Sequence, residues 1–97
     1  MNLLAYCHNY HLDMRLMPVM RELPPSEWYL FHVHSTNESA TLKTGYYTGV
    51  GANAKRVDMT DKVVQACMAA HFRFSVYNVA KRGGVTGNRV KIYFDKM

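Results

Sequence analysis

Two short segments in the C-terminal third of the chain alternate apolar residues with basic and aromatic ones. Residues 72–77 read Phe-Arg-Phe-Ser-Val-Tyr, and residues 89–95 read Arg-Val-Lys-Ile-Tyr-Phe-Asp. A period of two predicts strands that bury one face. The opposite face then holds the basic and aromatic residues. Cations can contact phosphates there, and tyrosine rings can stack on bases. The candidate nucleic-acid-binding residues are Arg73, Tyr77, Lys81, Arg82, Arg89, Lys91 and Tyr93, with Lys43, Lys55 and Arg56 from an earlier segment.

The segment that joins these two predicted strands, residues 82–88, is rich in glycine and flanked by basic residues. Glycine accepts backbone conformations that other residues avoid, so a turn here would let those cations approach a nucleic-acid backbone, as β-ribbon arms do. No helix is expected after Gly83, Gly84 and Gly87. These glycines therefore do not form a phosphate-binding loop, which leads into a helix.

The charge of the chain is unevenly distributed. Residues 1–42 hold two arginines against four carboxylates, whereas residues 43–97 hold ten lysines and arginines against three aspartates, within a formal net charge of +5. This asymmetry points to a polyanion or an acidic protein surface as partner. The alternative is that lysine and tyrosine simply suit the solvated face of a sheet, or protect its edges from aggregation.

Four histidines stand in pairs whose spacing suits metal binding. His32 and His34 share a face if their segment is a strand, and His8 and His11 lie one helical turn apart, with Cys7 adjacent. Imidazole pairs of this kind can hold Zn²⁺ or another transition metal. Neither spacing forms a recognised zinc framework, so we expect polar surface histidines, with no metal and no cofactor.

The string Leu-Phe-His-Val-His at residues 30–34 resembles the His-hydrophobic-His metal motif of the HUH endonucleases, which nick single-stranded DNA with a tyrosine. Tyr77 and Lys81 resemble the later Tyr and Lys pair of that family. The resemblance implies that His32 and His34 bind a divalent metal and that Tyr77 is the nucleophile forming a phosphotyrosine link. A nickase of this type is the third function considered.

Other arrangements give no support to catalysis. The carboxylates are scattered, with no pair at an informative spacing. Cys67 falls within an apolar helical stretch and is expected to be a small buried hydrophobe. We therefore expect a binding protein and not an enzyme.

Length and composition limit the class of protein. The chain has 97 residues, of which 48% are hydrophobic, so residues 1–97 are expected to form one globular domain. No apolar run approaches the roughly 20 residues that span a bilayer, and the N-terminus lacks the basic region of a signal peptide. With two cysteines and no disulfide framework, a cytoplasmic location is the expectation.

Two elements are predicted in the N-terminal half. A short helix with Pro18 in its first turn ends at Pro24 and Pro25. The aromatic segment from Trp28 to Ser35 predicts a strand, returning as a hairpin through a second strand at 41–48. If this hairpin joins the same sheet, the basic face is extended by Trp28, His32, His34, Lys43 and Tyr47.

The C-terminal half predicts a loop at residues 49–56, a helix beginning near Asp58 or Thr60 and ending by His71, and the two strands described above. A helix that continues through Lys81 is the alternative for residues 72–81. The predicted fold is α+β, with a four-stranded antiparallel sheet in β-β-α-β-β order, one main helix on one face and a short N-terminal helix.

A protein-binding function is the main alternative. Seven methionines and seven tyrosines are many for this length, and both types are enriched at interfaces. Met14, Met17 and Met20 would form an apolar patch beside Trp28. The chain would then be a small inhibitor or adaptor, of the type made by phages and mobile elements, that docks on an acidic protein or a nucleoprotein complex. The sequence leaves the oligomeric state open.

Overall fold

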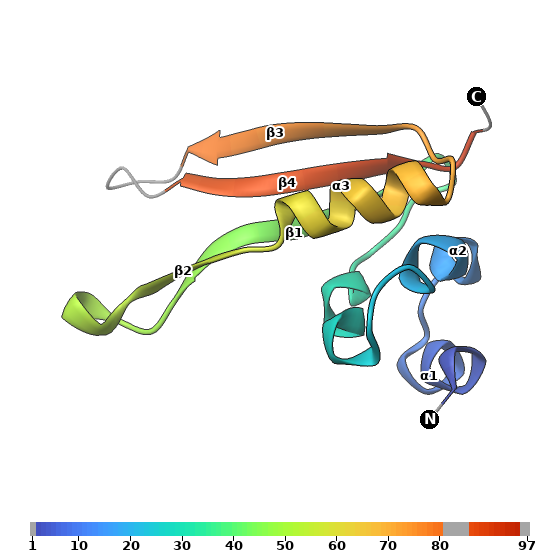
Figure 1. Ribbon diagram of the computed structural model, residues 1–97, viewed down its shortest axis with the longest axis horizontal. Coiled ribbons are helices and arrows are strands. Elements are labelled where there is room, and N and C mark those ends of the chain that lie inside the picture. Colours follow the sequence, from blue (N-terminus) through green and yellow to red (C-terminus); the bar gives the residue numbers. More distant parts are fainter. Residues whose placement is uncertain (1, 81–85, 96–97) are drawn as a thin grey trace.

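A four-stranded antiparallel sheet carries the main helix of the chain on one face (Figure 1). The computed structural model describes residues 2–80 and 86–95, so Lys81 and Arg82 lie outside the described residues. The strands are β1 (Ser39–Thr48), β2 (Lys55–Asp58), β3 (Phe74–Ala80) and β4 (Thr86–Tyr93), in the order β2-β1-β4-β3. Helix α3 (Thr60–Ala69) connects β2 to β3. The predicted α+β class and β-β-α-β-β order are confirmed, and residues 74–80 form a strand, not a helix.

Short helices precede the sheet. They are α1 (Leu3–Tyr10), the 3₁₀ helix η1 (Met14–Leu16), α2 (Met17–Met20) and the 3₁₀ helix η2 (Pro25–Phe31). Pro18 lies in the first turn of α2, where its missing N–H costs no hydrogen bond, as the sequence predicted. The Asn2 side chain accepts a hydrogen bond from the Ala5 N–H at 2.8 Å and caps α1. Within the described residues no helix is long and apolar enough to cross a membrane.

The strand predicted from Trp28 to Ser35 is wrong. Residues up to Phe31 belong to η2, and only Ser35 forms an isolated bridge, to Ala40. Trp28, Leu30 and Phe31 are all buried, which a half-buried strand with a period of two does not produce. Pro25 begins η2 with a backbone dihedral suited to a helical first turn, and the Trp28 indole donates to the Met20 carbonyl at 3.1 Å.

The true hairpin partner of β1 is β2, in a segment predicted as loop. Tyr46 pairs with Val57 and Tyr47 with Arg56. The connection contains Gly49 at a φ of +83°, where a Cβ atom would stand 2.8 Å from the Asn53 carbonyl oxygen, so a glycine is required there. The four residues of β2 are mostly exposed and form a strand because β1 supplies their hydrogen bonds.

Helix α3 begins as predicted, with the Asp58 side chain accepting from the Thr60 N–H at 3.0 Å. Hydrogen bonding from Thr60 lowers the pKa of the Asp58 carboxyl. Val63 and Cys67 are fully buried, as expected. Met68, however, is 56% exposed, because it belongs to the helix side turned away from the sheet. Burial raises the pKa of the Cys67 thiol to about 12, consistent with a hydrophobe and not a nucleophile.

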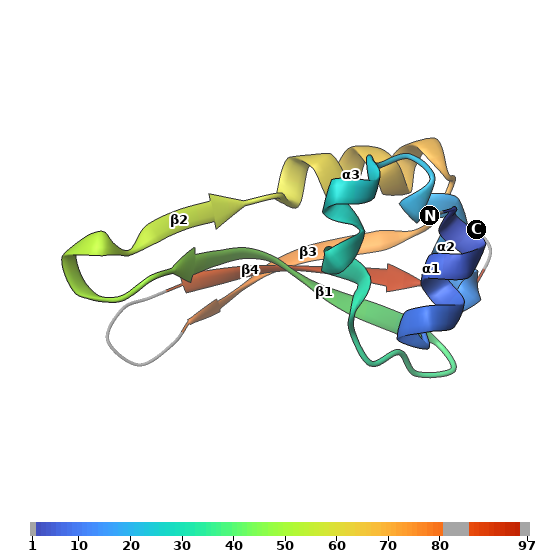
Figure 2. The same ribbon diagram turned by 90° about the horizontal axis from the view of Figure 1, so that it is seen from below.

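The core lies between the helices and the middle of the sheet. Leu42 of β1 and Val90 and Ile92 of β4 are fully buried on the side of α3, whereas the β1–β2 hairpin extends beyond the helices (Figure 2). Met20 and Trp28 belong to this core. The exposed apolar patch predicted beside Trp28 is therefore wrong, because these side chains instead join the N-terminal helices to the sheet.

Asp13 and Arg15 fasten η1 to the beginning of the sheet. The two side chains form an ion pair at 2.7 Å, and Asp13 also accepts from the Ser35 hydroxyl at 2.8 Å. The Arg15 guanidinium donates to the carbonyl oxygens of Thr36 and Asn37, each at 3.0 Å, and lies 3.9 Å from the centroid of the Phe94 ring. One arginine therefore contacts the chain before β1 and the chain after β4.

This contact predicts a stability that depends on acid pH. Hydrogen bonds from Arg15 lower the pKa of Asp13 to about 2, from an ordinary 3.8. The stabilisation, about 2 kcal/mol, is then fully present above pH 4 and is lost as the pH falls towards 2. We expect Asp13→Asn to destabilise the protein at pH 6 but to match the wild type near pH 2, as measured by urea unfolding. A difference that does not change with pH would contradict this role of the carboxylate.

Candidate nucleic-acid interface

The strand register gathers predicted cations on the sheet face opposite α3. Tyr77 pairs with Arg89, and Lys43 pairs with Arg89 from the other side of β4. Paired residues share a face, and Arg89 alternates with the buried Val90, so all three side chains lie on the side away from α3. We call this surface the open face; its candidate residues are Lys43, Arg73, Tyr77, Arg89, Lys91 and Tyr93.

Tyr93 stands at one end of the open face within a group of charges. The Arg73 guanidinium lies 3.9 Å and the Lys91 ammonium 5.2 Å from the centroid of its ring. Arg73 also forms an ion pair with Asp95 at 2.7 Å. This arrangement holds Tyr93 half-buried and partly neutralises Arg73, so Tyr93 and Arg73 are less available to a ligand than the alternation alone suggests.

Arg89 and Lys91 are the cations at the centre of the open face. Across the described residues, no carboxylate forms an ion pair with either of them or with Lys43. The Arg89 guanidinium lies across Gly87, where a Cβ atom would come within 2.7 Å of its Nη1 atom and 3.2 Å of the Gly45 carbonyl oxygen. Glycine at position 87 therefore gives the guanidinium room to lie along the strand. Tyr77, beside it on β3, is 42% exposed, which leaves ring surface for stacking.

A bulge in β1 changes which residues join this face. The pairing with β4 shifts between Lys43 and Gly45, so Tyr46, and not the predicted Tyr47, follows Lys43 on the open face. The Lys43 ammonium lies 5.7 Å from the Tyr46 ring centroid. A hydrogen bond with Tyr46 raises the pKa of Tyr29 to about 12. Tyr46 was missed because strict alternation carries no sign of a bulge.

Lys55 and Arg56 lie on opposite sides of the sheet because consecutive strand residues alternate, and the same bulge determines which of the two joins the open face. Lys55 follows the register of Tyr46 and stays on the open face, whereas Arg56 pairs with Tyr47 on the side of α3. The Arg56 side chain hydrogen bonds to Asn88, and Gly45 leaves space for this contact. Arg56 therefore lies apart from the cations of the open face, and the predicted extension of the basic face by Trp28 is wrong because Trp28 is buried.

The histidines lie elsewhere. Nε2 of His32 and the Tyr6 hydroxyl are hydrogen bonded at 2.7 Å, and both His32 and His34 follow η2 instead of lying on a strand. Helix η2 packs against β1, whereas Tyr77 is on β3 at the other edge of this part of the sheet. In the described ranges, 2–80 and 86–95, no group of three His, Cys, Asp or Glu residues could hold a metal ion.

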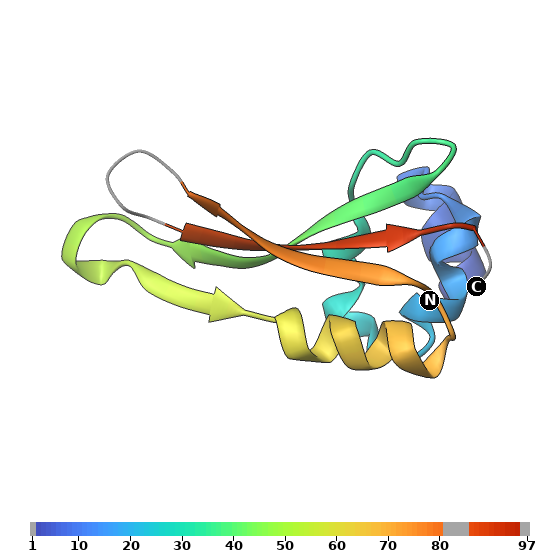
Figure 3. The same cartoon turned by 90° about the horizontal axis from the view of Figure 1, so that it is seen from above.

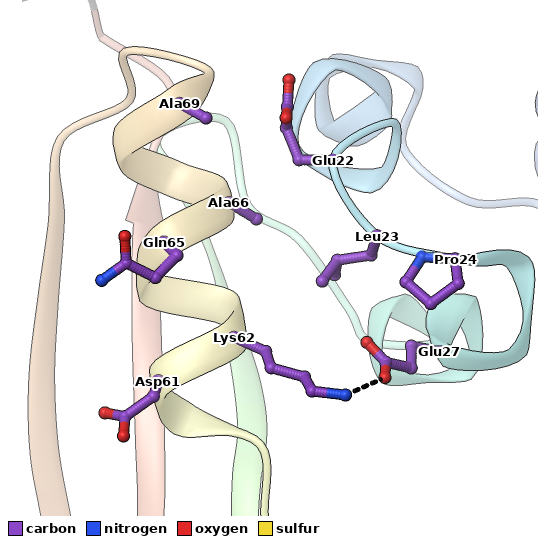
Figure 4. A pocket seen from close by; sticks show the side chains of 9 residues that line it. All are labelled: Glu22, Leu23, Pro24, Glu27, Asp61, Lys62, Gln65, Ala66 and Ala69. Atoms are coloured by element: carbon purple, nitrogen blue, oxygen red, sulfur yellow. Dashed lines mark hydrogen bonds and ion pairs between the residues drawn. The ribbon is translucent and has the colours of Figure 1, made fainter.

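A groove on the opposite side of the sheet separates α3 from the chain between α2 and η2 (Figure 4). It encloses about 560 Å³. Lys62 reaches across it to Glu27, with an ion pair of 2.7 Å, and Glu22 and Asp61 also line it. Because three carboxylates face one lysine, the groove repels phosphates and is not part of the nucleic-acid interface.

The open face is therefore the surface that fits the predicted chemistry, with three cations on β1 and β4 and an exposed tyrosine beside them on β3. Its residues come from β1, β3 and β4, so the sheet fixes their spacing. Comparison with protein-family models, with curated proteins and with solved structures gave no match to this chain.

Proposed function

We propose that this chain is a non-enzymatic protein that binds nucleic acid through its open face. The observation that carries the proposal is the register, which places Tyr77 beside Arg89, with Lys91 next along the same face of β4 and Lys43 on the other side of Arg89. Unpaired cations supply most of the affinity for a phosphate backbone. An exposed ring among them adds stacking on unpaired bases, worth about 1–3 kcal/mol for each base.

The geometry favours a single strand over a duplex. A single strand can lay its backbone along the row of cations while an unstacked base reaches Tyr77, whereas the bases of a duplex are already stacked. The contacts argued here are to phosphates and to a ring face, neither of which reads a base edge. The proposed binding is therefore tolerant of sequence and does not distinguish DNA from RNA.

Docking on an acidic protein or a nucleoprotein complex was the alternative. Its main support was an apolar patch around Met20 and Trp28, and both side chains are buried in the core. These cations, which have no carboxylate partner within the described residues, remain compatible with an acidic protein surface, but an exposed tyrosine beside them is better explained by a base. We therefore carry forward the nucleic-acid proposal alone.

The test is a salt titration of fluorescence anisotropy with labelled single-stranded DNA, single-stranded RNA and duplex DNA. For three or four phosphate contacts, log affinity should fall with log salt at a slope of about −2 to −3 on single strands. Tyr77→Ala should weaken single-strand binding by roughly 5-fold or more, with Tyr77→Phe close to wild type and duplex binding unchanged. Absence of binding at about 50 mM salt, where electrostatic association is strong, would refute the proposal.

A further inference from the structure

Strand β3 forms one edge of the sheet and is not covered by a helix. It pairs with β4 on one side only. Figure 1 shows it as the uppermost strand, and in Figure 3 it crosses in front of β4, with the N-terminal helices at one end of the sheet. Helix α3 packs mainly against β4 and β1. An uncovered edge strand presents a row of backbone groups ready to pair with another strand.

The backbone groups on this edge can be identified from the ladder. The Tyr93 N–H donates to the Arg73 carbonyl at 2.9 Å, so residues 73 and 93 form a hydrogen-bonded pair. Hydrogen-bonded pairs recur every second residue in an antiparallel ladder, which directs the N–H and C=O groups of Ser75, Tyr77 and Val79 towards β4. Those of Phe74, Val76 and Asn78 therefore point outward, away from β4.

The edge also lacks the usual protection against pairing. Natural edge strands carry lysine, proline or a bulge to prevent association, but residues 74–80 contain no charge and no proline, and their register with β4 is regular.

Val76 is 45% exposed on the α3 side of the sheet, against the expectation that it faces the core, because α3 does not reach over β3. Met68 of α3 is 56% exposed, and Val64 one turn before it is half-buried.

We infer that β3 pairs with β3 of a second copy of this chain, antiparallel, about a two-fold axis at Val76. Such an isologous pairing is self-complementary: Val76 lies opposite Val76, and Phe74 opposite Asn78, so all outward groups of these residues find partners. Because the strand is uncharged, no like charges meet along it, although the chain as a whole carries +5. The exposed Val76 side chains of the two copies then cover one another at the axis.

The pairing joins the two sheets into one of eight strands. The open faces become continuous, and Tyr77 of each copy lies beside Ser75 of the other, so the two sets of cations follow one surface. The dimer does not depend on the proposed nucleic-acid binding, and each can fail while the other stands.

Sedimentation velocity of the full chain without nucleic acid tests the pairing, from about 1 to about 100 µM. We expect wild type to form dimers over this range and Val76→Lys to remain monomeric, because two ammonium groups would meet at the axis. The matched control is Val50→Lys, at a position 84% exposed in the β1–β2 connection, which should still dimerise. A wild type that stays monomeric at the highest concentration, or a Val76→Lys variant that dimerises as well as the control, would overturn the inference.

A second variant separates pairing from folding. The Asn78→Pro variant lacks the N–H of residue 78 that points outward, but it keeps every backbone hydrogen bond to β4. We therefore expect this variant to be monomeric and to fold with a circular dichroism spectrum like that of wild type. Tyr77→Pro removes an N–H that points towards β4 and should lower the thermal midpoint clearly. A folded Asn78→Pro variant that still forms the wild-type dimer would also overturn the inference.

Discussion

Replacement of both Arg89 and Lys91 with glutamate is expected to reduce the affinity for single-stranded DNA by about 100-fold or more near 50 mM salt. The two cations lie on neighbouring open-face positions of β4, and no carboxylate of the described chain pairs with either of them. The change removes two phosphate contacts and adds two repulsive charges at the centre of the surface. Salt-dependent anisotropy measures it, and the loss should shrink as added salt screens the charges.

The control compares two single variants that change the net charge equally at different places on the molecule. Lys91→Glu and Arg21→Glu each lower the net charge by two units. Arg21 is exposed at the end of α2, on the part of the molecule that packs against α3, and its replacement should weaken binding only slightly. Equal losses for the two single variants would mean that net charge, and not the open face, determines the affinity.

The largest effect on stability is expected from Phe31→Ala. Phe31 is the last residue of η2, and its side chain is fully buried in the core. Truncation of a buried phenylalanine costs about 3–5 kcal/mol, a large share of the roughly 5–15 kcal/mol that stabilise a typical domain. For a chain of this size we expect the thermal midpoint to fall by about 15 °C or more, as followed by circular dichroism.

Tyr29→Ala is the matched control, because it truncates an aromatic residue of the same 3₁₀ helix whose side chain is exposed. Its side chain forms a 3.3 Å hydrogen bond to Tyr46, so its cost should be about 1 kcal/mol. If the two truncations destabilised the protein equally, η2 would not be packed as described.

The two halves of the sequence differ in how far they predict the structure. Residues 72–77 and 89–95 alternate strictly, and a period of two defines both a strand and its faces, so β3, β4 and most of the open face were predictable. Residues 28–35 are as rich in aromatic residues, but their burial on several sides comes from contact with the N-terminal helices. No local pattern contains that tertiary contact.

Two features of the site depend on how the strands pair. The sequence of a single strand does not contain this information. The bulge between Lys43 and Gly45 exchanges Tyr47 for Tyr46 and moves Arg56 to the other side. Residues 55–58 have an exposed, loop-like composition and become a strand only because β1 lies beside them. In both cases the partner strand, and not local propensity, determines the outcome.

The helices cover only part of the length of the sheet, which gives the protein unequal resistance to local opening. Backbone amides of β1 and β4 near Leu42 and Ile92 are protected by the packed core, whereas the β1–β2 hairpin near Lys55 extends beyond the helices and is mostly exposed, with the Arg56–Asn88 hydrogen bond joining it to β4. Opening of such a segment requires little free energy compared with global unfolding. In the proposed binding, the hairpin that carries Lys55 would therefore bend towards the nucleic-acid strand while the cations of β4 stay fixed, so that one end of the open face adapts and the other keeps its shape.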